Sequence, residues 1–261
     1  MRSKDRRSAA LSKPILPPGK RAIFFDVNQT LIRKQLTFEQ CFRRVWEEYA
    51  ARWDSEYIPS AEEIWKQYML QWRKHHKNRV PPSQLEELQR SCLQTAMTAL
   101  AVPVPASFAR SFLQEARTMQ SASKALLPGA DTALRTLASS YRLAIISNSP
   151  RKEIVALLKR FGLADLFPGD RIFTPGSAYE KKPSPHLFRI ALNAMKLTPR
   201  QAVMIGNSWA HDVVGAARAG IDSVWLQPGS VRSKEAVQKP KLGKRKVYVI
   251  QSLDQLTELF P

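Results

Sequence analysis

The stretch AIFFD, residues 22–26, constrains the fold of this chain more than any other. A short apolar run that stops at a polar residue is typical of a buried strand in a parallel sheet. Asp26 is then expected at the carboxyl end of that strand, where open α/β sheets gather their chemistry. A buried carboxylate is costly without a cation or hydrogen bonds, so Asp26 indicates either a turn cap or a functional group.

The length and composition of the chain are those of a globular protein. A length of 261 residues allows one large domain, or a domain with an insertion. Hydrophobic residues make up 44% and charged residues 24%, and no apolar run is long enough to span a bilayer, so we expect no membrane partner. Two cysteines, Cys41 and Cys92, are too few for a disulfide framework and are expected to be buried thiols.

The first residues of the chain are basic and rich in proline. Pro14, Pro17 and Pro18 interrupt any apolar region of a secretory signal. An organelle-targeting segment stays an alternative, although the same prolines disfavour the amphipathic helix that it would need. We therefore expect a cytoplasmic protein in which residues 1–20 form a basic, disordered tail.

The net charge of +19 raises the question of an anionic partner. Residues 1–21 and residues 232–246 each carry seven Lys or Arg and one acidic residue, so these two stretches hold +12 of the total. Both stretches have few apolar residues, which favours solvated tails and loops over a binding surface. A nucleic acid is therefore a possible partner but not the favoured one.

A long helical pattern separates the first predicted strand from the next. Three capping boxes mark helix starts at Thr37, Ser60 and Ser83, and a fourth helix is expected from Ser107. No strand pattern appears between residues 37 and 120. We predict an all-helical insertion over residues 37–119, of a size that could lie over a site as a lid.

The rest of the chain alternates between strands and helices. This alternation predicts an α/β fold with a doubly wound parallel sheet, formed by residues 21–36 and 120–261. The expected strands are residues 142–146, 171–173, 202–205, 222–226 and 246–250, and the expected helices are residues 131–139, 151–161, 184–195 and 212–219, with a last helix capped from Ser252.

Polar clusters follow three of the predicted strands. In a parallel sheet these strand ends lie at one edge, and the carboxylate of Asp212 and the ammonium group of Lys182 are placed to reach the same edge. Such a set suits the binding of a phosphoryl group, because it combines a nucleophile, oxygen ligands for a metal, a hydroxyl donor and a cation. The clusters are Asp26 to Asn28, Ser147 with Asn148, and Gly206 to Ser208.

These clusters, in this order, resemble the four motifs of the haloacid dehalogenase superfamily. FDVNQTL, residues 25–31, resembles the first motif, Ser147 with Asn148 the second, Lys182 with Pro183 the third, and GNSWAHD, residues 206–212, the fourth. The resemblance covers roughly residues 21–31 and 125–260, and the helical insertion stands where that family keeps its small helical cap. It implies a Rossmann-like core with an inserted cap.

The resemblance also implies an activity, because most members of the superfamily are Mg²⁺-dependent phosphohydrolases that act on small anionic substrates. Asp26 would attack phosphorus and form an aspartyl-phosphate. By the same resemblance the catalytic residues are Asp26, Asn28, Ser147 and Lys182, the substrate-binding residues are Thr30, Ser147, Asn148 and Lys182, and the Mg²⁺ ligands are Asp26, Asn28, Asn207 and Asp212.

Two positions depart from the pattern of the family's phosphatases. Asn28 stands where those enzymes usually carry a second Asp as general acid and base, and an amide does not titrate near neutral pH. Asn207 stands where they usually carry a metal-binding Asp, so the field at Mg²⁺ is expected to be weaker. Asn28 thus predicts reduced acid–base help, and Asn207 predicts weaker Mg²⁺ binding with Asp212 remaining as a ligand.

Two other functions stay open from the sequence. A 2-haloacid dehalogenase uses the Asp nucleophile without a second Asp or Mg²⁺, and Asn28 fits that branch, with Arg43 and Arg44 as candidates for holding the halide. A binding protein on an eroded enzyme fold is the third hypothesis, and the basic stretches would then carry its function.

Overall fold

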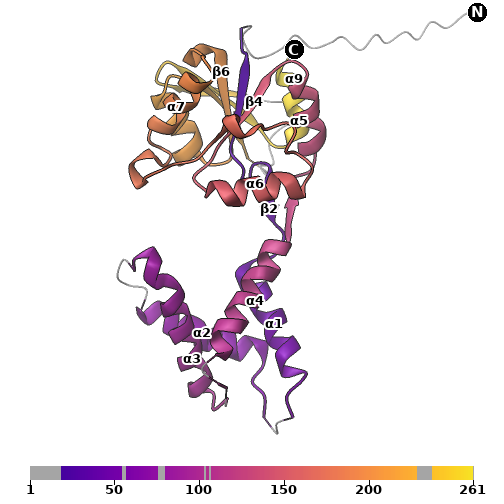
Figure 1. Cartoon of the computed structure of the whole chain (residues 1–261), viewed down its shortest axis with the longest axis vertical. Helices are drawn as coiled ribbons and strands as arrows, with labels where there is room; N and C mark the ends of the chain where they lie inside the picture. The colour runs from indigo at the N-terminus through magenta and orange to yellow at the C-terminus, as the bar shows by residue number, and fades with distance from the viewer. Residues whose placement is uncertain are drawn as a thin grey trace, which may run out of the picture. The chain divides into compact units, whose positions relative to one another are not determined.

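The computed structural model describes residues 19–54, 57–75, 80–102, 104–105, 107–227 and 237–260. These residues form two compact units (Figure 1). One unit, the core, contains the described residues up to Arg33 and from Leu126 onward, and the other, the helical unit, is Lys34–Ala125. Most of the tail predicted for residues 1–20 lies outside the described residues.

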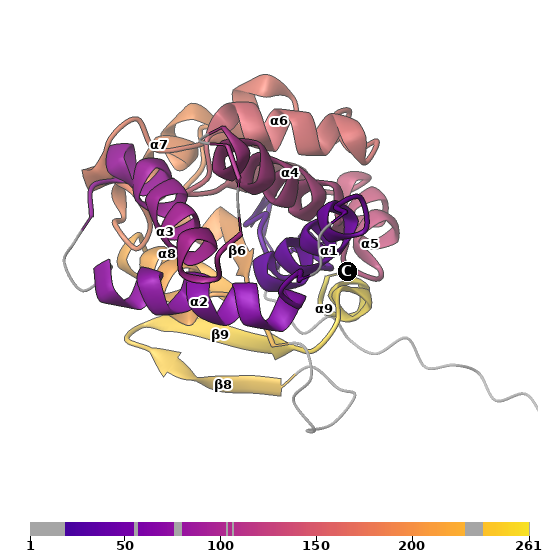
Figure 2. The same ribbon diagram turned by 90° about the horizontal axis from the view of Figure 1, so that it is seen from below.

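The core is built on a seven-stranded sheet with the strand order β5-β4-β1-β6-β7-β9-β8. The first six strands in this order are parallel, which confirms the predicted sheet, and β8 pairs antiparallel with β9 at the edge (Figure 2). The strands are β1 (Ala22–Phe25), β4 (Arg142–Ile146), β5 (Ile172–Phe173), β6 (Ala202–Gly206), β7 (Asp222–Leu226), β8 (Val237–Leu242) and β9 (Arg245–Ile250).

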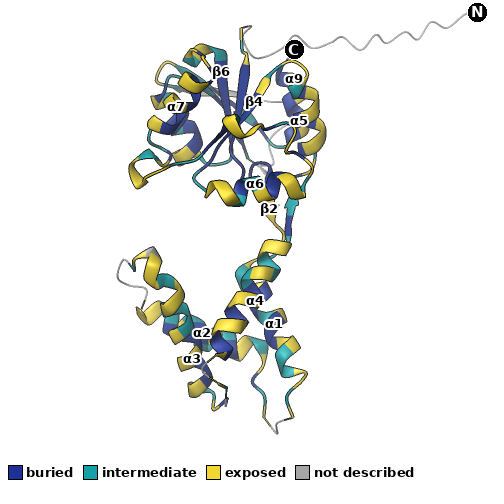
Figure 3. Cartoon of the chain, in the orientation of Figure 1, coloured by how far each residue is buried: buried dark blue, intermediate teal, exposed yellow. Residues whose placement is uncertain are grey.

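Helices cover both faces of this sheet, which is why β1 is apolar at every position. Ile23 and Phe25 pack in a cluster with α5, α6 and α9, whereas Ala22 and Phe24 pack with α7 and α8 on the opposite face. Figure 3 shows the central strands buried between the two layers. The helices are α5 (Ala130–Ala138), α6 (Arg151–Arg160), α7 (His186–Ala194), α8 (Val214–Arg218) and α9 (Leu256–Leu259), with a π-helical turn at Trp209–Val213 and 3-10 turns at Gly169–Arg171, Ala178–Glu180, Pro199–Gln201 and Leu253–Gln255.

The helical unit packs its own core around aromatic side chains. Phe42 contacts the rings of Tyr68 and Phe112, with centroids 5.2 and 4.7 Å away. Cys41 and Cys92 are buried free thiols in the same core, as predicted. The helices are α1 (Phe38–Ala50), α2 (Ala61–His75), α3 (Leu85–Ala99) and α4 (Phe108–Ala122), with a 3-10 turn at Pro82–Gln84. None of the described helices is long and apolar enough to cross a membrane.

The predicted helix caps have mixed outcomes. Thr37 forms a complete capping box with Gln40, and the Ser60 hydroxyl accepts a hydrogen bond from the Glu63 N–H at 3.3 Å, so both predictions are confirmed. The box predicted at Ser83 is wrong, because α3 begins only at Leu85 after a 3-10 turn. The short turn occupies the residues that would have supplied the cap.

Three of the observed strands were not predicted from the sequence. β2 (Ile32–Lys34) and β3 (Lys124–Leu126) pair at the division between the two units. β8 lies within the basic stretch 232–246, which was expected to be a solvated loop, and this part of the prediction is wrong for residues 237–242. The backbone hydrogen bonds to β9 outweigh the polar composition, and polar residues are tolerated at a sheet edge.

Lys20 belongs to the core rather than to a tail. Its side chain is only 4% exposed, and its Nζ donates to the Ala202 carbonyl at 2.9 Å and to Asp222 Oδ2 at 3.0 Å. These bonds tie Lys20, two residues before β1, to the starts of β6 and β7. The sequence pattern missed them because Lys20 follows a run without apolar periodicity.

Candidate functional site

The polar residues predicted to meet do lie together, at the carboxyl ends of the three central strands. Asp26 follows β1, Ser147 follows β4 and Asn207 follows β6. Since β4 and β6 are the two neighbours of β1, these residues occupy adjacent positions along one edge of the sheet. The Asp26 N–H donates to the Ile205 carbonyl at 3.0 Å, which continues the β1–β6 pairing up to the carboxylate.

Lys182 joins the two carboxylates of this edge. Its Nζ donates to Asp26 Oδ1 at 2.7 Å, to Asp212 Oδ1 at 2.6 Å and to the Ile146 carbonyl at 2.8 Å. The three side chains are buried, with exposed fractions of 2% for Lys182, 10% for Asp26 and 1% for Asp212. The prediction that Lys182 reaches this edge is therefore confirmed, and its three acceptors fix the position of the ammonium group.

Burial and charge shift the pKa values of this cluster. Burial raises the pKa of the Asp26 carboxyl above its ordinary value; Lys182 opposes this shift, and the nearby Asp212 carboxylate adds to it. Burial alone would lower the pKa of Lys182, but the two carboxylates outweigh it, and that pKa is raised. Lys182 is thus held as a cation, while burial disfavours the charged form of Asp26.

Thr30 links the first and fourth motifs. Its hydroxyl lies 3.3 Å from Asp26 Oδ2 and 3.2 Å from Asn207 Oδ1, and it accepts a hydrogen bond from the Asn207 N–H at 3.1 Å. Trp225 in β7 donates from Nε1 to the Asn207 carbonyl at 2.9 Å. Asn207 is therefore held on both sides, with its side-chain oxygen turned toward the hydroxyl beside Asp26.

The second motif is tied to the third through its amide. Asn148 Nδ2 donates to the Lys182 carbonyl at 3.0 Å, and the Lys182 N–H donates to Asn148 Oδ1 at 2.8 Å. This reciprocal pair positions the backbone of Lys182, so the Asn148 side chain acts on the loop that carries the cation. Ser147, 1% exposed, lies at the end of β4 next to it.

Ser149 is a site residue that the sequence analysis missed. Asn28 Nδ2 donates to Ser149 Oγ at 2.7 Å, and the Ser149 N–H donates to Ser147 Oγ at 3.3 Å. Ser149 thus connects the exposed Asn28 side chain to the hydroxyl of Ser147. Its position two residues after Ser147 is the signal that could have revealed it, because a serine-rich turn after a buried strand offers several donors to one edge.

Gly206 makes room for the Asp212 carboxylate. A Cβ atom at position 206 would lie 2.3 Å from Asp212 Oδ2, far inside van der Waals contact. The same oxygen accepts a hydrogen bond from the Ser208 N–H at 2.9 Å. The fourth motif therefore requires glycine at position 206, because the Asp212 side chain occupies the space that a Cβ atom would fill.

The substitution Gly206→Ala is expected to displace Asp212 and to lower the free energy of unfolding by about 1–3 kcal/mol. The measurement is urea-induced unfolding followed by circular dichroism. Gly169→Ala is the matched control, because its new Cβ would meet only Arg151 Nη2 at 3.5 Å, an ordinary contact. Equal stability of the two variants would contradict the close approach of Asp212 to Gly206.

Together these contacts gather eight of the predicted residues at one edge. Three of them, Asp26, Lys182 and Asp212, share direct contacts through the ammonium group. Thr30 contacts both Asp26 and Asn207, whereas Asn148 touches only the backbone of Lys182. The Asn28 side chain donates a hydrogen bond to Ser149 and, among the described contacts of this edge, none to either carboxylate.

A sequence model of the haloacid dehalogenase-like hydrolases matches residues 20–220. This match covers most of the chain, including all four motifs of the site, and the chain belongs to that family. The predicted family is therefore confirmed.

Relatives with assigned names match parts of the chain. The chain is 32% identical to the glyceraldehyde 3-phosphate phosphatase of Pyrococcus furiosus over 135 residues. These residues cover 51% of this chain and 53% of that protein. The chain is 31% identical over 103 residues to the phosphoglycolate phosphatase of Psychrobacter arcticus, 39% of this chain and 44% of that protein. The chain thus spans about half the length of these curated relatives.

Solved structures resemble the chain over nearly its whole length. The HAD-hydrolase YfnB from Bacillus subtilis matches with a TM-score of 0.59 at 19% identity, over 92% of this chain and 98% of that one. A 2-haloacid dehalogenase from Pseudomonas syringae matches with a TM-score of 0.54 at 21% identity, over 92% of this chain and 97% of that one. At these identities the likeness shows the fold alone, and it agrees with the predicted α/β core and inserted helices.

Proposed function

We propose that this protein is a phosphatase that hydrolyses small phosphate monoesters through an aspartyl-phosphate on Asp26. The observation that carries the proposal is the buried cluster in which Lys182 holds Asp26 and Asp212 at the carboxyl edge of the sheet. The names of the matched relatives support the same class of substrate, because they are phosphatases of small phosphorylated metabolites.

In the proposed reaction an oxygen of Asp26 attacks phosphorus, and the bond from phosphorus to the leaving oxygen breaks. The leaving oxygen takes up a proton from solvent as the alcohol departs, and a water molecule then hydrolyses the acyl phosphate to regenerate the carboxylate and release phosphate. Lys182 offsets negative charge on the transferred group. Ser147 and Thr30 would donate hydroxyl hydrogen bonds to its oxygens, and Asn148 keeps the Lys182 loop in place.

The donors at this edge fit Mg²⁺ in type, because all of them are oxygen atoms. Asp26 and Asp212 supply carboxylates, and Asn28 and Asn207 supply carbonyl oxygens. Two carboxylates against one ammonium group also leave an excess of negative charge for a divalent cation to offset.

This set of ligands carries less negative charge than a site with three carboxylates. Among the described residues, no group of three His, Cys, Asp or Glu side chains lies close enough together to hold a metal. When bound, Mg²⁺ would supply positive charge to the transferred phosphoryl oxygens. The YfnB structure, with the same fold, is bound to magnesium.

Asn28 defines what kind of phosphatase this would be. Its amide can donate a hydrogen bond to a leaving oxygen but cannot deliver a proton near neutral pH. General acid–base help is worth about 10²–10⁴-fold, so esters with poor leaving groups would be turned over slowly. We therefore propose that the enzyme prefers substrates whose leaving group is stable as an anion or is protonated by solvent at the exposed Asn28 position.

The test is a screen of phosphate monoesters and 2-haloacids, each with Mg²⁺ and with a chelator. The proposal expects release of inorganic phosphate that requires Mg²⁺ and no release of halide. Halide release in the presence of chelator would establish the dehalogenase instead. No turnover of any substrate, with the protein folded, would leave the hypothesis of a binding protein on an enzyme fold.

A further inference from the structure

The segments that precede the core strands are strongly basic. The stretches that lead into β1, β4, β6, β7 and β9, taken together with the first one or two residues of these strands, carry nine Lys or Arg and one carboxylate, Asp222. The segment before β5, at one end of the sheet, is balanced, with Asp170 beside Arg171. The nine cations are Lys20, Arg21, Arg142, Lys196, Arg200, Arg218, Lys244, Arg245 and Lys246.

The register of the sheet brings these segments to one edge. Ala22 at the start of β1 pairs with Arg142 on one side and with Ala202 on the other. Val203 pairs with Asp222, and Ser223 pairs with Val247, so the starts of the five strands lie in one row. This amino edge is the end of the sheet opposite to the candidate catalytic site, which lies at the carboxyl ends.

The one carboxylate of the amino edge is already neutralised. Asp222 accepts from Lys20 Nζ at 3.0 Å through Oδ2 and from the Lys246 N–H at 3.0 Å through Oδ1. The pKa of Lys20 is nevertheless lowered, first by burial and further by the like charges of Arg245 and Lys246. Among the described residues the edge therefore keeps a surplus of positive charge that no carboxylate balances.

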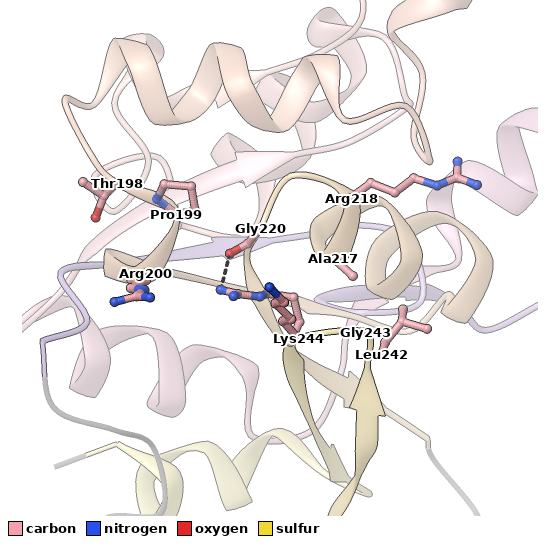
Figure 4. Close-up of a pocket in the computed structure, with 10 residues that line it drawn as sticks. Thr198, Pro199, Arg200, Ala217, Arg218, Gly220, Leu242, Gly243 and Lys244 are labelled. Atoms are coloured by element: carbon pink, nitrogen blue, oxygen red, sulfur yellow. Dashed lines mark hydrogen bonds between the residues drawn. The ribbon is translucent and has the colours of Figure 1, made fainter.

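A groove at this edge presents part of that charge. It has a volume of about 570 Å³ and lies between the starts of β6 and β7 and the β8–β9 turn (Figure 4). Arg245 donates to the Gly220 carbonyl at 2.9 Å, whereas Arg200 and Lys244 have no hydrogen-bond or ion-pair partner within the described part of the chain. None of the described residues that line the groove is aromatic.

We propose that the amino edge of the core sheet binds the phosphate backbone of double-stranded nucleic acid. Cations without carboxylate partners are the groups that contact phosphates, and their number exceeds what one small phosphate ester would need. The absence of aromatic residues from the groove argues against stacking on bases, which single-stranded ligands use.

The length of the edge supports a polymeric ligand. Neighbouring strands are about 4.8 Å apart, so the row from β4 through β1, β6 and β7 to β9 extends for about 19 Å. Cations occur at every strand of this row, from Arg142 at one end to Lys246 at the other. A duplex carries about one charge per 1.7 Å of its axis and can meet several of these cations at once.

The proposal is independent of the proposed phosphatase activity and is tested by binding without substrate. The probe is a fluorescein-labelled 20-bp DNA duplex, and its anisotropy is measured with the full chain between 50 and 200 mM salt. We expect a Kd on the order of micromolar at low salt. The double variant Arg200→Gln/Lys244→Gln is expected to weaken binding about tenfold and to reduce the slope of log K against log salt by about two.

The matched control removes two exposed cations from another surface. Lys152→Gln/Lys159→Gln, in α6, loses the same charge and is expected to change the Kd less than twofold. A second duplex of unrelated sequence should bind equally well. Equal weakening by both double variants would overturn the proposal in favour of general charge attraction. Tight competition by inorganic tripolyphosphate would overturn it in favour of a small-ligand pocket, and a wild-type chain that binds no duplex at 50 mM salt would refute it outright.

Discussion

The substitution Asp26→Asn is expected to reduce turnover of every phosphate ester by at least about a thousandfold, because it removes the proposed nucleophile. The amide keeps the size of the carboxylate and an oxygen that can accept from Lys182 Nζ, now at 2.7 Å. The measurement is phosphate release at saturating substrate and Mg²⁺. Retention of activity in this variant would show that the nucleophile is another group.

The same variant is expected to stay folded, with a thermal midpoint within about 5 °C of the wild type. Burial already disfavours the charged form of Asp26, so loss of that charge removes a cost as well as an ion pair. Lys182 keeps its bond to Asp212 and to the Ile146 carbonyl. Asp170→Asn, at an exposed position, is the matched control and should leave both activity and stability unchanged.

The substitution Asn28→Asp is expected to raise turnover of alkyl phosphates tenfold or more, since it supplies a carboxyl group that can give and take a proton. Asn28 is exposed and its side chain lies 2.7 Å from the Ser149 hydroxyl, which can donate to the new carboxylate. Nitrophenyl phosphate should gain little in the first step, because nitrophenolate leaves without a proton. The quantity to measure is therefore the ratio of alkyl-phosphate turnover to nitrophenyl-phosphate turnover, which should rise in the variant.

The control for this experiment is Gln29→Glu, which adds the same charge at the adjacent exposed residue. Turnover must be compared at saturating Mg²⁺, because a new carboxylate also strengthens metal binding. If both variants raise alkyl-phosphate turnover equally, the gain comes from charge and not from proton transfer. A dehalogenase would instead lose activity on Asn28→Asp, since the new carboxylate repels a carboxylate substrate.

Much of the candidate site could be predicted because its residues follow strands that are apolar at nearly every position. The burial of β1, β4 and β6 marks where each strand stops, and the next polar residue then lies at the sheet edge. Lys182 and Asp212 are less direct, since neither ends a strand. Their assignment rested on the motif order, and their shared contacts with Asp26 come from the structure.

The contacts between side chains could not be predicted, because they depend on distances that a sequence does not contain. The hydrogen bond from Asn28 to Ser149 joins residues 121 positions apart. The contact between Thr30 and Asn207 joins residues 177 positions apart. Neither pair has a local pattern, and each forms only when β1 lies between β4 and β6.

The sequence shows how many basic residues the chain has, but it does not show where in the fold they lie. The basic stretch 232–246 suggested a solvated loop, yet residues 237–242 of it form β8. Strand pairing at an edge needs backbone groups more than apolar side chains, so composition alone is a poor guide there. The gathering of cations at the amino edge likewise became visible only with the register of the sheet.

The central position of β1 sets an order for folding during synthesis. Phe25 pairs with Ile145 and with Ile205, so the neighbours of β1 are made about 120 and 180 residues after it. At about 5–20 residues per second, β1 waits on the order of ten seconds for both. The helical unit, Lys34–Ala125, is complete before either neighbour exists and has its own core. The first core strand to leave the ribosome therefore gains its second neighbour only about 180 residues later, and it is an apolar segment that depends on shielding until then.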